Sequence, residues 1–396
     1  MRTLGIVVAG YCAFLQLYST QPLLPRLTQI FHAGTVEVSL TVTMAALGVA
    51  LSAPFAGLLA DRLGRKRVIV WSAFSLATCS LLAATSPNLE TLIFWRFLQG
   101  VFTPGVFSVT VAYINDEWPP GEVGRTLSAY VSGTVMGGLS CRFIAGLVAS
   151  RFDWHWVFVV LGTLNLAGAV AVALLLQPES HTLHLTAPRG SVMAAVREHL
   201  HNPLLRAAFA VGFCVLFSLI AIFTYVTFYL AAPPFHLEPA ALGSIFFVYL
   251  IGAAVNPIAG RAIDRFGHRK VLACSIGAGV AGVALTLIPN LVAVAAGLTI
   301  CSTGTFAAQT AGSGFIGLAA DRYRALAVGM YATFYYIGGS LGAAVPGYFW
   351  NRGGWPACAA FIVSVQILTV VLALRFWKEQ QPSSGEPAFI AAAEID

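Results

Sequence analysis

The sequence is poor in charged residues: only 10% of its 396 residues are Asp, Glu, Lys or Arg, whereas a typical soluble domain has about 25%. Hydrophobic residues make up 58% of the chain and form long runs without charge. About 20 such residues in a helix span the hydrocarbon core of a bilayer. The shortage of charge therefore excludes a water-facing fold and predicts a membrane protein built of helices.

Signals of catalysis and metal binding are also missing. The seven cysteines lie singly in apolar runs and form no C-x-x-C pair, which argues against a disulfide framework or a zinc site. No Gly-Lys dipeptide occurs, so the chain has no P-loop for ATP. Two matches to soluble-enzyme motifs, at 312–317 and 338–342, lie in apolar runs without the strand that each motif requires. We therefore expect no enzyme activity, no metal and no cofactor.

Twelve apolar segments are long enough to be membrane-spanning helices. They cover residues 4–25, 37–60, 68–86, 91–113, 127–149, 156–176, 205–231, 240–260, 271–288, 291–317, 325–349 and 355–376. A polar linker at 177–203 separates a first half at 1–176 from a second half at 204–377, and we expect the polar tail at 378–396 to be disordered. Residues 191–200 of the linker are expected to form a short amphipathic helix on the membrane surface. The predicted fold is an all-α membrane protein with twelve transmembrane helices in two six-helix halves.

The few charges are distributed unevenly between the two sides of the predicted bundle. Nearly all Lys and Arg residues outside the spans lie on the side that holds both termini and the linker, whereas Arg26, Arg151 and Arg352 lie on the other. The positive-inside rule then predicts that the N- and C-termini are cytoplasmic. The net charge of +6 is therefore explained by membrane topology and does not indicate binding of nucleic acid. The expected partner is a lipid bilayer.

A loop sequence occurs twice. Residues 57–67, after the second span, read GLLADRLGRKR, and residues 260–270, after the eighth span, read GRAIDRFGHRK, at a constant offset of 203 residues. Duplication of a six-helix unit around the linker is the simplest explanation, and parallel six-helix halves are a known transporter architecture.

These residues resemble the major facilitator superfamily. The pattern G-x-x-x-D-R-x-G-[RH]-[RK]-[RK] is the signature of that superfamily between its second and third spans, and residues 96–100, RFLQG, are similar to its fourth-span motif R-x-x-Q-G. Residues 18–25 and 137–142 resemble the bacterial efflux branch, which contains sugar, nucleoside and drug exporters. In the fifth span the chain departs from that branch, because it has Cys141 at a glycine position and no proline from 121 to 177.

The resemblance implies a secondary active transporter that exports a small organic molecule by alternating access. It further implies substrate binding near the bilayer midplane between the halves, proton antiport as the energy source, and a monomer in the bacterial inner membrane. Two alternatives remain open at this point. The chain could be an organic-anion exchanger or importer that uses Arg96 and Arg142, or, from another class, a membrane-embedded enzyme or receptor.

The resemblance also implies a gate at the cytoplasmic ends of the helices. Asp61 can interact favourably with the N-terminus of a neighbouring helix, while Arg65 or Arg62 pairs with an acid, for which Asp116 is the natural candidate. A plain positive-inside loop is the alternative. The expected gating residues are Gly57, Asp61, Arg62, Gly64, Arg65, Asp116, Arg125 and, in a weaker second copy, Asp264 and Arg265.

Small residues recur every four positions in the fifth span and cluster in the eleventh. Such spacing lets helices approach closely, either as static packing or as sliding surfaces. Because spans two, five, eight and eleven form the moving seam in the superfamily, we expect sliding surfaces. The expected seam residues are Gly133, Gly137, Cys141, Gly339 and Gly342.

Two arginines lie inside predicted spans. Arg96 is roughly 8 Å and Arg142 roughly 12 Å from the outer ends of their helices at 1.5 Å per residue. An ionisable residue at such depth indicates a functional site, although a structural arginine bonded to backbone carbonyls is the alternative. No Asp, Glu or His lies centrally in any span, so the charge of the cavity favours neutral or anionic cargo over dications. The expected substrate or coupling residues are Tyr18, Gln21, Arg96, Gln99, Arg142, Tyr225, Gln309 and Tyr335.

Overall fold

The computed structural model describes residues 2–179, 192–320 and 323–377, and within these residues the chain is almost entirely helical. The expected all-α fold is confirmed. The helices are α1 (Arg2–Phe14), η1 (Gln21–Leu23), α2 (Leu24–Phe31), α3 (Thr35–Leu63), α4 (Arg65–Ala83), α5 (Leu89–Glu117), α6 (Pro120–Arg151), α7 (Trp154–Leu175), α8 (Val192–His201), α9 (Pro203–Ala231), α10 (Pro239–Ser244), η2 (Ile245–Phe247), α11 (Val248–Phe266), α12 (His268–Leu285), α13 (Leu291–Ala319), α14 (Arg324–Ala344) and α15 (Pro346–Phe376).

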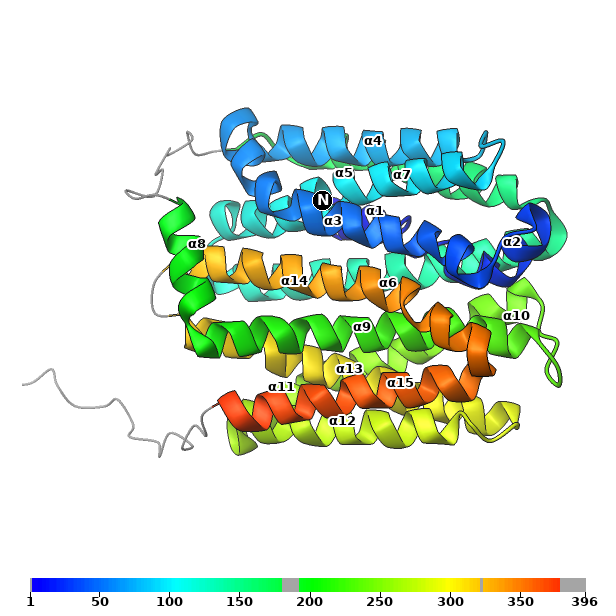
Figure 1. The fold of residues 1–396 in the computed structure, drawn as a ribbon. Coiled ribbons are helices and arrows are strands. Elements are labelled where there is room, and N and C mark those ends of the chain that lie inside the picture. The colour runs from blue at the N-terminus through cyan, green and yellow to red at the C-terminus, as the bar shows by residue number, and fades with distance from the viewer. Residues whose placement is uncertain (1, 180–191, 321–322, 378–396) are drawn as a thin grey trace, which may run out of the picture.

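The long helices lie side by side in one bundle, with the N-terminal helices along one side and the C-terminal helices along the other (Figure 1). Among the described residues, nine helices are long and apolar enough to cross a membrane by length and composition. The other expected spans correspond to three segments: α1 with η1 and α2, the shorter helix α12, and α14 with the first turns of α15.

The first span is not the continuous helix that its apolar run predicts. α1 ends at Phe14, residues 15–20 form turns, and η1 and α2 then complete the crossing. The prediction of one helix over 4–25 is therefore wrong. α15 is interrupted as well, because Gly353 and Gly354 have non-helical backbone angles. Its first turns extend α14, and the rest is the twelfth span.

The duplicated loops have the same backbone geometry. Gly64 links α3 to α4 at φ 94°, and Gly267 links α11 to α12 at φ 84°. Both angles lie in a region that only glycine enters at little cost, which is why each copy of the loop has glycine at that position. The sequence repeat is thus also a structural repeat.

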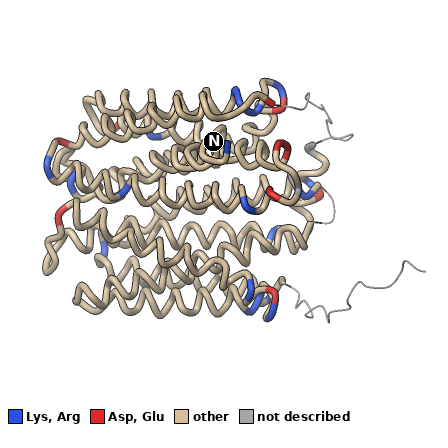
Figure 2. Tube along the Cα trace, turned by 180° about the vertical axis from the view of Figure 1, so that it is seen from behind, with Lys and Arg blue, Asp and Glu red and all other residues tan. Residues whose placement is uncertain are grey.

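Charged residues gather at the two ends of the bundle, while its middle is almost free of them (Figure 2). We call the end that holds the Gly64 and Gly267 loops the basic end, and the opposite end, which holds the α2–α3 and α9–α10 connections, the far end. α8 lies at the basic end, beside the first turns of α9 and α14 (Figure 1). Its range agrees with the helix expected in the linker, whereas the tail expected to be disordered lies outside the described residues.

Candidate functional site

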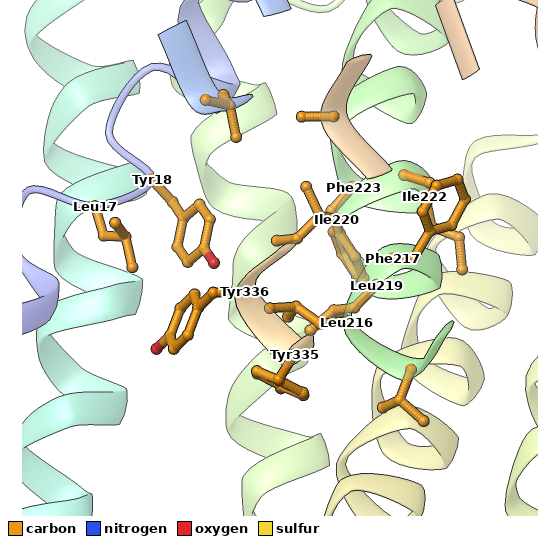
Figure 3. Close-up of a cluster of buried hydrophobic side chains, with 14 of the residues drawn as sticks. Leu17, Tyr18, Leu216, Phe217, Leu219, Ile220, Ile222, Phe223, Tyr335 and Tyr336 are labelled. Carbon is orange, nitrogen blue, oxygen red and sulfur yellow. The ribbon is translucent and has the colours of Figure 1, made fainter. Parts of the chain in front are cut away.

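A central cavity of about 290 Å³ lies between the two groups of helices. The first half contributes the turn after α1 and the middle of α6, and the second half contributes α9, α11, α13 and α14. Its walls are mostly aromatic and aliphatic: Tyr18 and Tyr336 project toward one another across from Leu216, Leu219 and Ile220 of α9 (Figure 3). Polar groups among the lining residues are Thr134, Arg142, Asn256, Gln309, Thr310 and Ser313, together with the tyrosines.

Access to this cavity is from the basic end. Val131 and Ser313, on the wall nearest the basic end, are exposed, while Tyr18, Arg142 and Tyr249 at the deep end are buried. The basic ends of several helices also have open space around their glycines: a Cβ on Gly57 or Gly260 would meet nothing within 4 Å. The structure therefore shows a conformer that is open at the basic end.

The far end is closed by contacts between the two halves. A Cβ on Gly146 of α6 would lie only 2.2 Å from the carbonyl oxygen of Pro239, at the start of α10. The hydroxyl of Ser340 on α14 donates a 3.0 Å hydrogen bond to the carbonyl of Thr43 on α3. The seam between the halves is therefore made by α6 with α10 and by α3 with α14.

Arg142 is the charged residue of the cavity lining, and its side chain is almost completely buried. Its Nε donates to Oε1 of Gln21 at 2.7 Å, and its Nη1 donates to the carbonyl of Gly138 at 2.5 Å. Its guanidinium carbon lies 4.7 Å from the ring centre of Tyr18, 4.8 Å from that of Phe246 and 5.1 Å from that of Tyr249. At such distances ring faces attract a cation, so both halves hold this guanidinium in place.

Arg96 has a different environment, although it is also fully buried. Its Nη1 donates to the carbonyl of Gln16 at 2.6 Å and also to the side chain of Gln99, its Nη2 donates to the carbonyl of Leu17, and its Nε donates to the carbonyl of Thr41 at 3.2 Å. Gln16 and Leu17 lie in the break of the first span, where helical hydrogen bonding is interrupted. In lipid the carbonyls of such a break need internal partners: Arg96 bonds to both, and Ser19 also donates to that of Gln16.

The other expected substrate residues also fall into two groups, those that line the cavity and those that lie outside its lining. Gln309 and Tyr335 line the cavity beside Tyr18. Gln21 is buried behind the lining, where it joins Arg142 to Thr224 of α9. Gln99 is bonded to Arg96, outside the cavity lining.

Tyr225 also lies outside the lining. Its hydroxyl donates a 2.8 Å hydrogen bond to the carbonyl of Ala343, which ties α9 to α14. Phe246 and Tyr249 around the deep part of the site were not expected from the sequence, because aromatic residues in apolar runs carry no signal that separates packing from binding. Asn256 of α11, which also lines the cavity, was not expected either.

At the basic end the structure brings together Arg65 and Asp116. Arg65 forms an ion pair with Asp116 at the end of α5 and a longer one, 3.8 Å, with Asp61. Asp61 is more than half exposed. Within the described residues, Arg62, Arg125, Asp264 and Arg265 form no ion pair.

A linker residue also reaches this loop. Glu179 accepts a 2.7 Å hydrogen bond from the backbone N–H of Lys66, in the first turn of α4. A carboxylate at this position satisfies a free N–H group and interacts favourably with the helix dipole. The linker is thereby attached to the loop that the sequence marks as a gate.

The small residues of the expected seam lie elsewhere. A Cβ on Gly133 or Gly137 would meet the backbone of α1, and a Cβ on Gly339 or Gly342 would meet α9. Each contact is therefore within one half in this conformer. Cys141 is buried, and its thiol bonds to the carbonyl of Gly138 on its own helix. Among the described residues, Gly146 and Gly243 approach one another across the seam, and Gly347 approaches Val36 of α3.

No three His, Cys, Asp or Glu side chains of the described ranges gather in a way that could hold a metal ion. The site is instead an amphipathic cavity, open at the basic end and lined by one cationic side chain, that of Arg142, at the junction of two related helical halves. Clefts of this kind, apolar with a few oriented polar groups, bind small organic molecules. Their placement between repeats is typical of secondary transporters.

Comparison with known proteins agrees with this architecture. A family model described as the Major Facilitator Superfamily matches residues 6–233 and 228–394. The inner membrane transport protein YnfM of Escherichia coli (strain K12) is 31% identical over 374 residues, which cover 94% of this chain and 89% of the relative. The uncharacterized MFS-type transporter YybF of Bacillus subtilis (strain 168) is 30% identical over 376 residues, which cover 95% of this chain and 91% of that protein.

Among solved structures, that of the nucleoside transporter NupG has the same fold. Its TM-score is 0.80 at 14% sequence identity, and the match covers 96% of this chain and all of NupG (100%). Two duplicated loops, a cavity between the halves and a family model that matches nearly the whole sequence lead to one conclusion: the chain belongs to the major facilitator superfamily and is a membrane transporter of that type.

Proposed function

We propose that this transporter exports a small amphipathic organic molecule by alternating access, with the cargo bound in the central cavity. The observation that carries the proposal is the cavity itself. It lies between the halves, opens at one end and is closed at the other by contacts of α6 with α10 and α3 with α14. Rocking of the halves would open the far end and close the basic end around the same site.

We further propose that the protein resides in the bacterial inner membrane as a monomer, with the basic end and both termini in the cytoplasm. The distribution of Lys and Arg supports this orientation. The printed name of the relative YnfM, an inner membrane transport protein, supports the location. In this orientation the conformer that the structure shows faces the cytoplasm, from which an exporter loads its cargo.

Proton antiport is the proposed energy source, and it rests on the resemblance to the efflux branch. No carboxylate is present among the described lining residues, so the group that would carry the proton is sought outside the described lining. An organic-anion exchanger is the second candidate, and the observation that favours it is the single positive charge of Arg142 in the cavity. The two candidates differ in the driving force that they require.

Inside-out vesicles test the proposal. Labelled neutral and anionic compounds should accumulate in vesicles that contain the protein when the lumen is acidic, and the accumulation should disappear when an ionophore collapses the pH gradient. Vesicles without the protein are the control. Accumulation that needs an internal counter-anion and ignores the pH gradient would establish the exchanger, and uptake only in right-side-out vesicles would contradict export.

A further inference from the structure

We propose that Arg142 is an anion-binding residue and that the cargo is a small organic acid, with one carboxylate on an apolar body. This inference rests on the proposed transport through the central cavity, and it names the substrate class of that site. It is carried by a comparison of the two arginines buried inside the spans, which have the same charge and nearly the same burial but different partners.

Arg96 uses all three of its nitrogen atoms. Nε, Nη1 and Nη2 together donate four hydrogen bonds, three of them to backbone carbonyls. Four of its five N–H groups are used in this way, and the residue does not line the cavity. Its chemistry is that of a structural arginine.

Arg142, by contrast, makes only two hydrogen bonds, from Nε and Nη1. Its Nη2, with two N–H groups, has no hydrogen-bond partner in the described part of the chain, although the side chain is only 3% exposed and lines the cavity. Nη2 is not among the fully enclosed side-chain atoms that lack a partner, so it is accessible from the cavity. The free side of the guanidinium therefore has the donor geometry that a carboxylate accepts.

The charge balance leads to the same ligand. Within the part of the chain that the structure describes, Arg142 forms no ion pair and no acidic side chain lines the cavity. Its neighbours are neutral: Gln21 offers one oxygen, and Tyr18, Phe246 and Tyr249 offer ring faces. A buried charge without a counter-ion is unfavourable. One bound monoanion neutralises it, whereas a cation would add to the repulsion.

The other walls of the cavity indicate the size and polarity of the rest of the ligand. Beyond Arg142 the walls are Leu216, Leu219, Ile220 and Phe306, together with the rings of Tyr335 and Tyr336. Figure 3 shows Tyr335 beside Leu216 and Tyr336 beside Tyr18. A volume of about 290 Å³ is at the lower limit for drug-sized ligands. The site therefore fits a compact body, such as one aromatic ring, that is placed against these walls while its carboxylate meets Arg142.

Three probes of nearly equal shape test the inference: benzoate, benzamide and benzamidinium, measured by ligand-observed NMR on the full chain in nanodiscs at neutral pH. Benzoate should bind at least about tenfold more tightly than the other two, because a charge-assisted hydrogen bond is worth about 1.5–3 kcal/mol. Arg142→Gln should remove this preference. Arg151→Gln, which changes an exposed arginine at the end of the same helix, is the matched control and should retain it.

A second measurement leaves Arg142 intact, in case Arg142→Gln does not fold. A Cβ on Gly138 has room, since its nearest neighbour would be Nη1 of Arg142 at 3.6 Å. Benzoate should therefore slow thiol labelling of Gly138→Cys, and benzamide should not. Absence of benzoate binding, equal binding of the three probes, or a preference that survives in Arg142→Gln would each overturn the inference.

The outcomes separate this inference from the proposed function. Benzoate binding at Arg142 in a protein that moves none of the panel compounds across vesicles would support the anion site and contradict export. Gradient-driven export of a neutral or cationic compound that benzoate does not inhibit and that Arg142→Gln does not slow would support the proposed function and overturn the anion site.

Discussion

Gln21 and Thr224 are hydrogen-bonded to one another, with the side-chain amide of Gln21 as donor at 3.2 Å, and they are 203 residues apart. The same offset relates the two copies of the loop, such as Gly57 and Gly260. Equivalent positions of a repeat touch one another only near the axis that relates the repeats. Gln21 also accepts the bond from Nε of Arg142, so the proposed anion site lies beside this axis.

Thr224→Val should weaken the conformer that the structure shows. The variant keeps the side-chain shape but leaves the buried amide of Gln21 without its acceptor, at a cost of about 1–3 kcal/mol. The far ends should then separate in a larger fraction of molecules, which spin labels at 151 and 238 can measure. Thr227→Val is the control, because that hydroxyl bonds within its own helix. Identical distance distributions for the two variants would contradict a bond between the halves.

Gly146→Ala should also open the far end. The added methyl group would lie 2.2 Å from the carbonyl oxygen of Pro239 and 3.1 Å from the Cα of Gly243. Overpacking of this kind costs about 1–3 kcal/mol, which changes the ratio of two conformers about 5- to 150-fold. The same label pair, in a background without the exposed Cys274, reports the shift.

Gly124→Ala is the matched control for this experiment. It lies on the same helix as Gly146, at a position where a Cβ meets nothing within 4 Å. Its label distances should equal those of the wild type. A closed far end in Gly146→Ala would mean that α6 and α10 do not form the seam as described.

The positions of the spans were predictable because they depend on the length of apolar runs. The repeated loops were predictable because the two copies share the same sequence pattern. The break in the first span was not. Its run from 4 to 25 is apolar throughout, and the residue that stabilises the break, Arg96, is supplied by α5. Contacts of this kind have no trace in the local sequence.

The sequence also did not predict which helices pack against one another. The spacing of Gly133 and Gly137 predicts that some backbone comes close, and the structure shows α1 of the same half. Small residues indicate a close approach but do not identify the neighbour. For the same reason the sequence could mark both Arg96 and Arg142 as buried arginines, yet only the carbonyl partners of Arg96 distinguish the two.

Membrane topology gives a further prediction. Because Lys and Arg are concentrated at the basic end, the positive-inside rule places that end in the cytoplasm. Cysteines introduced at 62 and 265 should be protected from an impermeant thiol reagent in intact cells, whereas cysteines at 32, 236 and 352 should react. Labelling of 62 or 265 from outside would reverse the orientation, and with it the proposed direction of transport.

Asp61→Asn tests the gate. In the conformer shown, Asp61 is more than half exposed and contacts only Arg65 of its own half, at 3.8 Å, so the variant should leave this conformer intact. If Asp61 interacts with a helix N-terminus when the basic end closes, the loss is on the order of 1 kcal/mol. Transport should slow, and labels at 63 and 266 should report fewer closed molecules.

Asp264→Asn is the corresponding change in the second copy of the loop, where the sequence predicts a weaker interaction. It should slow transport less than Asp61→Asn does. If Asp61→Asn changes neither transport nor the 63–266 distance, the loop that contains Asp61 does not act as a gate and serves only to set membrane topology.

Arg96→Lys should destabilise the protein more than Arg142→Lys does. Lysine keeps the charge but presents its donors from a single atom, so it cannot reach the carbonyls of Gln16, Leu17 and Thr41 together. Loss of about two of these bonds to a charged group costs on the order of 3 kcal/mol, which should lower the midpoint of thermal unfolding by several degrees. Arg142 makes only two hydrogen bonds, to Gln21 and Gly138, and a lysine can keep one of them, so Arg142→Lys loses about one bond. Unfolding in detergent, followed by tryptophan fluorescence, compares the two. A larger loss in Arg142→Lys would reverse the assignment, with Arg142 as the structural arginine and Arg96 as the candidate for cargo.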